Sequence, residues 1–208
     1  MSMIKRSVCK LCRREKQKLF LKGQRCFTDK CALDRKPYPP GQKAKMRLIE
    51  TEFYTQLREK QKAKRYYGIL ERQFRNYYKK AVRKRGITGE TLLQLLETRL
   101  DNVIYLIGFA TSRAQAKQLI SHGHIFVDGR KVDIPSYQLK EGQEISVSPS
   151  SKEITPVLEA KESGSSLTPP EWLEVDLGNL KGRLLKIPER DEIKVPINEM
   201  MIVELYSK

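Results

Sequence analysis

The residues whose spacing most clearly indicates chemistry are the four cysteines, which all lie within the first 31 of 208 residues. Cys9, Cys12, Cys26 and Cys31 form the pattern C-x2-C-x13-C-x4-C. A C-x2-C pair turns the backbone so that both sulfur atoms face one ion, and a second pair about a dozen residues away completes a tetrahedral set. We therefore expect a structural Zn2+ site with no open coordination position. An iron–sulfur cluster, free thiols and a redox pair stay open as alternatives.

The formal net charge of +16 is concentrated at the N-terminal end of the chain. Residues 1–86 contain 27 Lys and Arg against 7 Asp and Glu, whereas residues 87–208 contain 14 against 18. A field of this strength indicates an anionic partner such as a nucleic acid.

Residues 49–85 have a helical pattern that Gly68 is expected to interrupt. On the first helix, Arg58, Lys62 and Arg65 recur at i, i+4 and i+7 and predict a continuous cationic ridge. The apolar stripe of the second helix consists of Leu70, Phe74, Tyr77 and Ala81. A second basic ridge on another side of the same helix consists of Arg72, Arg75, Lys79 and Arg83. Basic ridges with interleaved tyrosines suit an RNA surface, while each Tyr taken singly is more simply explained as a core residue.

The sequence contains no recognisable catalytic constellation. It has no G-x-x-x-x-G-K loop, no H-E-x-x-H motif, and only two histidines, His122 and His124, which flank a glycine. The longest apolar run, VIYLIGFA, is far shorter than the roughly 18–20 residues that span a bilayer. We expect a soluble, cytoplasmic protein that is not an enzyme and has no small-molecule substrate.

Residues 98–147 predict two helices followed by a hairpin and a return strand. The first helix places Leu100, Val103, Ile104 and Ile107 on one face and ends at Gly108. Ser112 is expected to cap the second helix in a capping box with Gln115, and Gly123 to end it. The second helix buries Ala116, Leu119 and Ile120 and turns Arg113, Lys117 and Ser121 to the opposite side.

Asp128-Gly129 predicts a two-residue hairpin turn. Pairing outward from it places Ile125, Val127 and Val132 on the buried face and Phe126 and Lys131 on the other. Arg113, Lys117, Lys131 and Phe126 are then expected near one outer surface, which suits contact with an RNA backbone. An ordinary helical hairpin with solvated charges is the simpler alternative.

The C-terminal stretch is less informative. Residues 148–166 are polar and Ser-rich and predict a loop, and residues 167–195 contain short strand-like runs. Trp172 is expected to anchor a core. In the last segment, Ile197, Met201 and Leu205 share one helical face.

The run RLDNVIYLIGFATSRAQAKQLISHGHIFVDGRKVDIPS resembles the S-four-type RNA-binding domain of ribosomal proteins, pseudouridine synthases and tyrosyl-tRNA synthetases. The blocks KLFLKG, PYPPGQ and QLREKQKAKRYYGILERQFRNYY, in that order, resemble the family of bacterial-type small-subunit ribosomal protein four. The chain departs from that pattern at Leu106 and Lys117, where the family commonly has Arg, and at Lys43-Ala44-Lys45.

The resemblance implies an α+β fold: a mostly helical basic domain with an N-terminal four-cysteine zinc segment, plus a small S-four-type RNA-binding module of two helices packed on a small antiparallel sheet. The expected parts are residues 1–44 (zinc segment and linker), 45–97 (basic helical domain), 98–160 (S-four-type domain) and 161–208 (C-terminal extension, whose tail packs back on the helical domain).

It also implies a structural protein of the small ribosomal subunit that binds the 5′ domain of 16S rRNA and nucleates assembly of the subunit body. Contact with neighbouring small-subunit protein five, proximity to the mRNA entry path, a contribution to translational accuracy and, in some members, operon repression belong to the same implication. The expected location is cytoplasmic and ribosome-bound, with an organellar stroma or matrix left open. We expect Arg113→Glu or Lys117→Glu to weaken rRNA binding without unfolding the protein.

The expected RNA-binding residues are Arg13, Arg14, Lys22, Arg25, Lys36, Arg47, Arg58, Lys62, Lys64, Arg65, Arg72, Arg75, Arg83, Arg99, Arg113, Lys117, His122, His124, Arg130 and Lys131. Two other functions stay open: a stand-alone RNA-modification or ribosome-rescue factor with the same module, and a zinc-dependent nucleic-acid-binding regulator.

Overall fold

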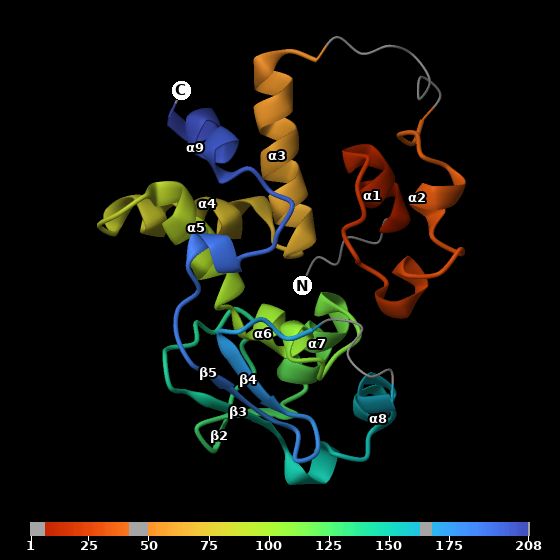
Figure 1. The fold of residues 1–208 in the computed structure, drawn as a ribbon, viewed down its shortest axis with the longest axis vertical. Helices are drawn as coiled ribbons and strands as arrows, with labels where there is room; N and C mark the ends of the chain where they lie inside the picture. The colour runs from red at the N-terminus through yellow and green to blue at the C-terminus, as the bar shows by residue number, and fades with distance from the viewer. Residues whose placement is uncertain (1–6, 42–49, 163–167, 208) are drawn as a thin grey trace.

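The computed structural model describes residues 7–41, 50–162 and 168–207. Its first part is short and helical, with α1 (Cys9–Glu15), the 3-10 turn η1 (Gly23–Cys26) and α2 (Ala32–Arg35). This segment buries few apolar side chains, among them Leu19 and Cys12. Its helix α1 contacts α3. Figure 1 shows it as the red and orange part beside the long helix α3.

The helical half consists of α3 (Glu52–Tyr66), α4 (Glu71–Arg83) and α5 (Thr88–Glu97). Gly68, with a φ of +61°, separates α3 from α4 as predicted, because this left-handed conformation strains any residue with a Cβ. Phe74, Tyr77 and Ala81 are buried on α4 as the apolar stripe predicts. Leu70 does not belong to that stripe: it precedes the helix and is 47% exposed.

The module contains α6 (Leu100–Leu106) and α7 (Arg113–Ser121), packed against a five-stranded antiparallel sheet of order β2-β1-β3-β5-β4. The strands are β1 (Ile125–Val127), β2 (Arg130–Lys131), β3 (Glu144–Val147), β4 (Leu173–Asp176) and β5 (Lys181–Leu184). The α+β class and the small antiparallel sheet are confirmed. The two strands β5 and β4 were not expected in this sheet: β5 pairs with β3 through Ile145↔Gly182, so the sheet extends well past residue 160.

Local signals in the module act largely as predicted. Asp128 and Gly129 have φ of +50° and +74°, which the two-residue hairpin turn requires, and Gly108 ends α6 at φ +79°. Ser112 Oγ accepts a hydrogen bond from the Gln115 backbone N–H at 3.3 Å. The capping box is wrong in one detail, because Gln115 Oε1 accepts from the Thr111 backbone N–H at 2.6 Å instead of from Ser112.

The expected loop over residues 148–166 is wrong as far as residue 162, where the described part of this segment ends. It contains the 3-10 turn η2 (Pro149–Ser151) and the helix α8 (Thr155–Glu162), whose Val157 and Ala160 are buried. The segment is polar and Ser-rich overall, but Val157 and Ala160 are three positions apart and lie on one side of a helix. Burial of these two side chains is sufficient to pack a short helix against the module.

The tail continues through the 3-10 turn η3 (Arg190–Glu192) to α9 (Glu199–Ser207), which packs on α3 and α5 (Figure 1). Of the predicted apolar face, Ile197 is buried while Met201 and Leu205 are only half-buried; the fully buried residue of α9 is Ile202.

Two hydrophobic cores result. One lies between α6, α7 and the sheet and includes Trp172, which is 1% exposed as predicted for a core anchor. The other lies between α3, α4 and α5 and includes Ile193, Ile197 and Ile202 from the tail. The chain therefore leaves the helical half to build the module and returns to complete the core of the helical half. Within the described parts of the chain, no helix is long and apolar enough to cross a membrane.

Candidate nucleic-acid interface

An exposed basic surface lies on α4. Arg72, Arg75, Lys79 and Arg83 are exposed, on the side of the helix away from the buried Phe74. None of the four side chains forms an ion pair or hydrogen bond with another described residue. Because their charge is not neutralised within the described protein, this basic ridge is available to an anionic partner.

The hairpin of the module presents a second exposed group. Arg130 and Lys131 are exposed on β2 of the hairpin, and His122 is exposed at the C-terminal end of α7. The Lys131 side chain lies across Gly123: a Cβ at that position would lie 2.0 Å from Lys131 Cε. His124 is half-buried, with Nδ1 2.8 Å from Ser151 Oγ, so its ring is anchored to η2.

The predicted basic ridge on α3, made of Arg58, Lys62 and Arg65, is paired with carboxylates of the same chain. Arg58 donates from Nη2 to Glu15 Oε1 at 2.6 Å, and Arg65 pairs with the same carboxylate. Lys62 pairs with Glu59 at 2.6 Å. These cations lie on α3 as the periodicity predicts, but they are engaged by carboxylates of α1 and α3. Lys64 is likewise held, 2.9 Å from Glu71.

The basic residues of the N-terminal segment divide into two groups. Arg13 donates to the Tyr38 carbonyl at 2.9 Å and lies over the Tyr38 ring, and Arg14 donates to the Pro40 carbonyl at 3.2 Å. Their guanidinium groups fasten the loop after α2 onto α1. The exposed members are Lys22, Arg25 and Lys36. Arg47, also predicted to contact RNA, lies outside the described residues, as does Lys43-Ala44-Lys45.

Arg113 is placed wrongly by the sequence pattern. It is buried at 5% exposure, and its guanidinium lies 4.0 Å from the centre of the Tyr66 ring and 4.4 Å from that of Tyr105. Its Nε donates to Asn102 Oδ1 at 2.8 Å. Arg113 therefore joins α7 to the end of α3, and charge reversal here is no longer expected to leave the fold intact.

A buried polar network continues from Asn102. Asn102 Nδ2 donates to Glu97 Oε2 at 2.7 Å, and the Tyr67 hydroxyl donates to Glu97 Oε1 at 2.6 Å. Burial raises the pKa of Glu97, although the hydrogen bonds and Arg113 oppose it. Burial beside the carboxylate also raises the pKa of Tyr67 well above its ordinary value. The network joins the helical half to the module through hydrogen-bonded side chains.

Arg99 and Lys117 complete this joint. Arg99 is buried and Lys117 is half-buried, so Lys117 does not lie on the outer surface that the sequence pattern assigned to it. Arg99 is 2% exposed; it forms a bidentate pair with Asp101 at 2.9 and 2.6 Å and donates to the Tyr77 hydroxyl at 2.7 Å. Lys117 Nζ donates to the Tyr67 and Gly68 carbonyls and lies 3.5 Å from Asp101. Burial lowers the pKa of Lys117 although Asp101 opposes it.

Sequence reasoning missed Glu97, Asp101 and Asn102 as functional positions. A usable signal was present, because polar residues crowd into the otherwise apolar run LLQLLETRLDNVIYLI. Acidic, basic and amide side chains at buried positions indicate an internal network rather than a solvated face.

The four cysteines lie close enough to affect one another. Burial raises the pKa of Cys12, and the neighbouring Cys26, Cys9 and Cys31 raise it further. The Lys22 backbone N–H donates to Cys26 Sγ at 3.4 Å. In the described part of the chain, however, no three His, Cys, Asp or Glu side chains are arranged so that they could hold a metal ion. Four thiols within one short segment nevertheless provide the donor chemistry that a thiolate-binding metal requires.

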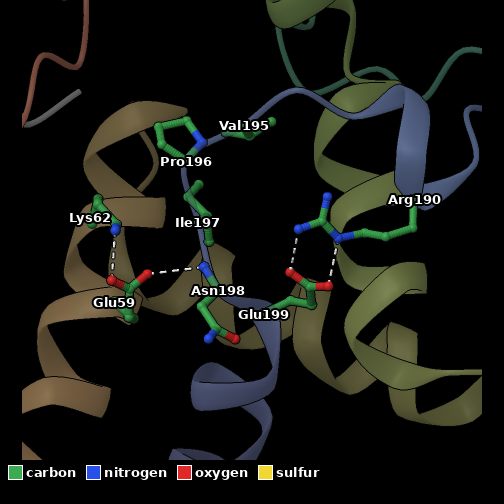
Figure 2. A pocket seen from close by; sticks show the side chains of 8 residues that line it. All are labelled: Glu59, Lys62, Arg190, Val195, Pro196, Ile197, Asn198 and Glu199. Carbon is green, nitrogen blue, oxygen red and sulfur yellow. Dashed lines mark hydrogen bonds and ion pairs between the residues drawn. The ribbon is translucent and has the colours of Figure 1, made fainter.

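A hollow of about 480 Å³ lies where the tail crosses α3. Figure 2 shows Glu59 between Lys62 and the backbone of Asn198, facing the Arg190–Glu199 ion pair. Arg190 holds Glu199 through two hydrogen bonds of 2.6 and 3.1 Å. Because these lining charges are paired with one another, the hollow fastens the tail to the helical half and offers no group poised for catalysis.

A basic helical half joined to a compact module with an exposed basic hairpin defines a nucleic-acid-binding protein. Residues 3–97 match the family model described as ribosomal protein S4/S9 N-terminal domain, and residues 98–145 match that of the S4 domain. Proteins named small ribosomal subunit protein uS4 are similar over nearly the full length. That of Natranaerobius thermophilus is 57% identical over 97% of both chains, and those of Halothermothrix orenii and Koribacter versatilis are 53% and 56% identical over 100% of both chains. The chain belongs to the uS4 family of small ribosomal subunit proteins.

Proposed function

We propose that this chain is a structural component of the small ribosomal subunit that binds the 5′ domain of 16S rRNA directly and nucleates assembly of the subunit body. The observation that carries the proposal is the family match, which spans both halves of the chain. The unpaired basic ridge of α4 supports it, because it supplies charges for phosphate contacts. Proteins of this family are structural and are not enzymes.

The chemistry of binding divides between the two halves. Exposed Lys and Arg supply salt-dependent affinity, and the buried joint at Arg113 fixes the shape that a folded RNA junction must match. Contact with small-subunit protein five, proximity to the mRNA entry path, a contribution to translational accuracy and a cytoplasmic, ribosome-bound location complete the proposal.

Competition binding tests the assignment. Labelled 5′ domain of 16S rRNA is bound by the protein and challenged with excess unrelated structured RNA at several salt concentrations. Binding that survives competition at moderate salt supports a specific rRNA-binding protein. Equal displacement by any RNA would show that only general electrostatic attraction operates, and would return a transient RNA factor to consideration.

We propose further that Cys9, Cys12, Cys26 and Cys31 bind one structural Zn2+. Their spacing, their mutual effect on Cys12 and the small apolar content of residues 7–41 support this proposal, because a bound metal would replace the missing core. Elemental analysis of protein purified without chelator should give one zinc per chain, and iron would indicate a cluster. Cys9→Ser/Cys12→Ser should lose the metal and N-terminal order while keeping the module folded; stoichiometric zinc in that variant would contradict the site.

A further inference from the structure

Glu15 is a buried carboxylate at the joint between the N-terminal segment and α3. Its side chain is 2% exposed at the end of α1. It accepts from Arg58 Nε at 3.2 Å and from Arg58 Nη2 at 2.6 Å, and it also accepts from Arg65 Nη1. One carboxylate therefore fixes two guanidinium groups that lie two helical turns apart on α3.

This cluster contains more positive than negative charge. The charge of Arg14 also acts on Arg65, although the Arg14 guanidinium itself donates to the Pro40 carbonyl. Burial lowers the pKa of Arg65, and the two neighbouring arginines lower it further, although Glu15 opposes them. Arg58 and Arg65 share the single carboxylate of Glu15, so the cluster of these three residues carries one positive charge that is not neutralised within it.

The guanidinium groups also have unused donors. Arg58 engages Nε and Nη2, and Arg65 engages Nη1, so Arg58 Nη1 and two nitrogens of Arg65 make no hydrogen bond to another described residue. The two side chains are 22% and 21% exposed, so they can be reached from solvent while remaining anchored from below. Guanidinium groups held in this manner match the oxygens of a phosphate group.

We propose that Glu15 is a positioning residue which holds Arg58 and Arg65 as a preformed binding site for one phosphodiester group of the RNA backbone. The inference rests on the proposed rRNA binding and assigns one contact within it. Arginine side chains that are already ordered lose less conformational entropy on binding, so the buried carboxylate increases affinity despite its negative charge.

The test uses the sign of the effect of Glu15→Gln on the affinity for the 5′ domain of 16S rRNA. General electrostatics predicts tighter binding, because the variant gains one net positive charge. The positioning role predicts weaker binding by roughly tenfold, the scale of one lost charged hydrogen-bonded contact. Glu71→Gln is the matched control: Glu71 also binds two cations, Lys60 and Lys64, and its removal should leave affinity unchanged or tighter.

A combined variant separates positioning from loss of structure. Arg58→Gln/Arg65→Gln should weaken binding and lower the salt dependence by about one phosphate contact. Adding Glu15→Gln to that variant should change nothing further, because no arginine pair remains to be positioned. A further loss of affinity from Glu15→Gln in this background would show that the residue acts only through the fold, and would overturn the inference.

The same measurements distinguish the two proposals. Wild-type protein that is displaced equally by any structured RNA contradicts the rRNA-binding function itself. Wild-type protein that binds specifically, with Glu15→Gln binding equally well or more tightly, leaves that function intact and contradicts the phosphate site alone.

Discussion

At the scale of single residues, Arg113 shows how this protein holds a charge away from water. Two aromatic rings at 4.0 and 4.4 Å face its guanidinium, and Asn102 accepts from Nε. Burial works to lower the pKa of Arg113, but Tyr66, Tyr105 and Glu97 together raise it, so the side chain stays cationic. Its Nη2 is buried with no hydrogen-bond partner among the described residues, so the site depends on the rings as well as on hydrogen bonds.

Arg113→Glu should therefore destabilise the protein rather than only weaken RNA binding. A carboxylate here would face Glu97 in a buried site, and removing one member of a buried charged network costs about 3–5 kcal/mol. Urea unfolding followed by circular dichroism measures the change. Arg130→Glu makes the same charge reversal on the exposed hairpin and should change the free energy of unfolding by less than about 0.5 kcal/mol. Equal stability of the two variants would contradict the structural role of Arg113.

Glu71 gives a residue-scale prediction for pH. Burial works to raise the pKa of Glu71, but hydrogen bonds from Lys60 and Lys64 lower it to about 2 from an ordinary value of 4.5. Because the folded state favours the ionised form, Glu71 stabilises the fold above pH 4.5, and that contribution is lost as pH falls from about 4.5 to about 2.

Glu71→Gln should accordingly lower the free energy of unfolding at about pH 6 and make little difference near pH 2. Urea unfolding of both proteins across this range measures the difference. Glu174→Gln, at an exposed position on β4, is the control and should show no such pH-dependent gap. A constant difference between wild type and Glu71→Gln at all pH values would contradict the assignment of the effect to ionisation.

At the scale of elements, the tail helix α9 belongs to the core of the helical half. Ile202 is fully buried in the cluster that includes Phe74 and Leu92. Ile202→Ala should destabilise the protein by about 2–5 kcal/mol, because a cavity forms where the side chain was. Met200→Ala, on the same helix at 55% exposure, is the control and should have little effect. Near-equal stability of both variants in denaturant titrations would show that α9 does not contribute to that core.

The elements that the sequence predicts well are those with local signals. Gly108, Ser112 and the Asp128-Gly129 turn each act on residues within one turn of the chain, and the corresponding ends and turns form as expected. The pairing of β5 with β3 and the return of α9 to α3 depend on contacts between distant segments, which periodicity does not reveal. The helix α8 was missed because its short apolar pattern lies in a polar segment.

The same difference between local signals and distant contacts explains which predicted RNA-binding residues are exposed and which are buried or paired. The α4 ridge is exposed as its spacing predicts, because the opposite stripe alone decides which side is buried. Arg58 and Arg65 pair with Glu15, which is more than 40 residues away in the sequence. Arg113 lies over Tyr66, and Arg99 binds Tyr77 as well as the nearby Asp101. Except for Asp101, these partners are distant in the sequence. A basic side chain alone does not indicate whether a carboxylate of the same chain or an external phosphate neutralises it.

At the scale of the whole molecule, some basic side chains are paired with carboxylates of the same chain and others are not. The unpaired set should govern most of the salt dependence of RNA binding, and the Arg58–Arg65 site should add about one phosphate contact. Arg72→Gln/Arg75→Gln/Lys79→Gln removes three charges from the α4 ridge, whose residues make no ion pair with a described residue. Each lost phosphate contact should lower the slope of log affinity against log salt by about 0.7–0.9, so the variant should lose roughly two to three units of slope. The fold should be unaffected, because these side chains are exposed.

Lys181→Gln/Lys186→Gln/Lys194→Gln removes the same net charge from exposed positions in the C-terminal region, where Lys181 and Lys186 already pair with Glu144 and Glu192. Because Glu144 and Glu192 neutralise two of these three lysines, the slope should change by at most about one unit in this variant. Filter binding or fluorescence anisotropy with the 5′ domain of 16S rRNA at several salt concentrations measures both slopes. If both variants lost the same slope, net charge alone would govern binding and the position of the ridge on α4 would not matter; a loss confined to the α4 variant would place the phosphate contacts on that helix.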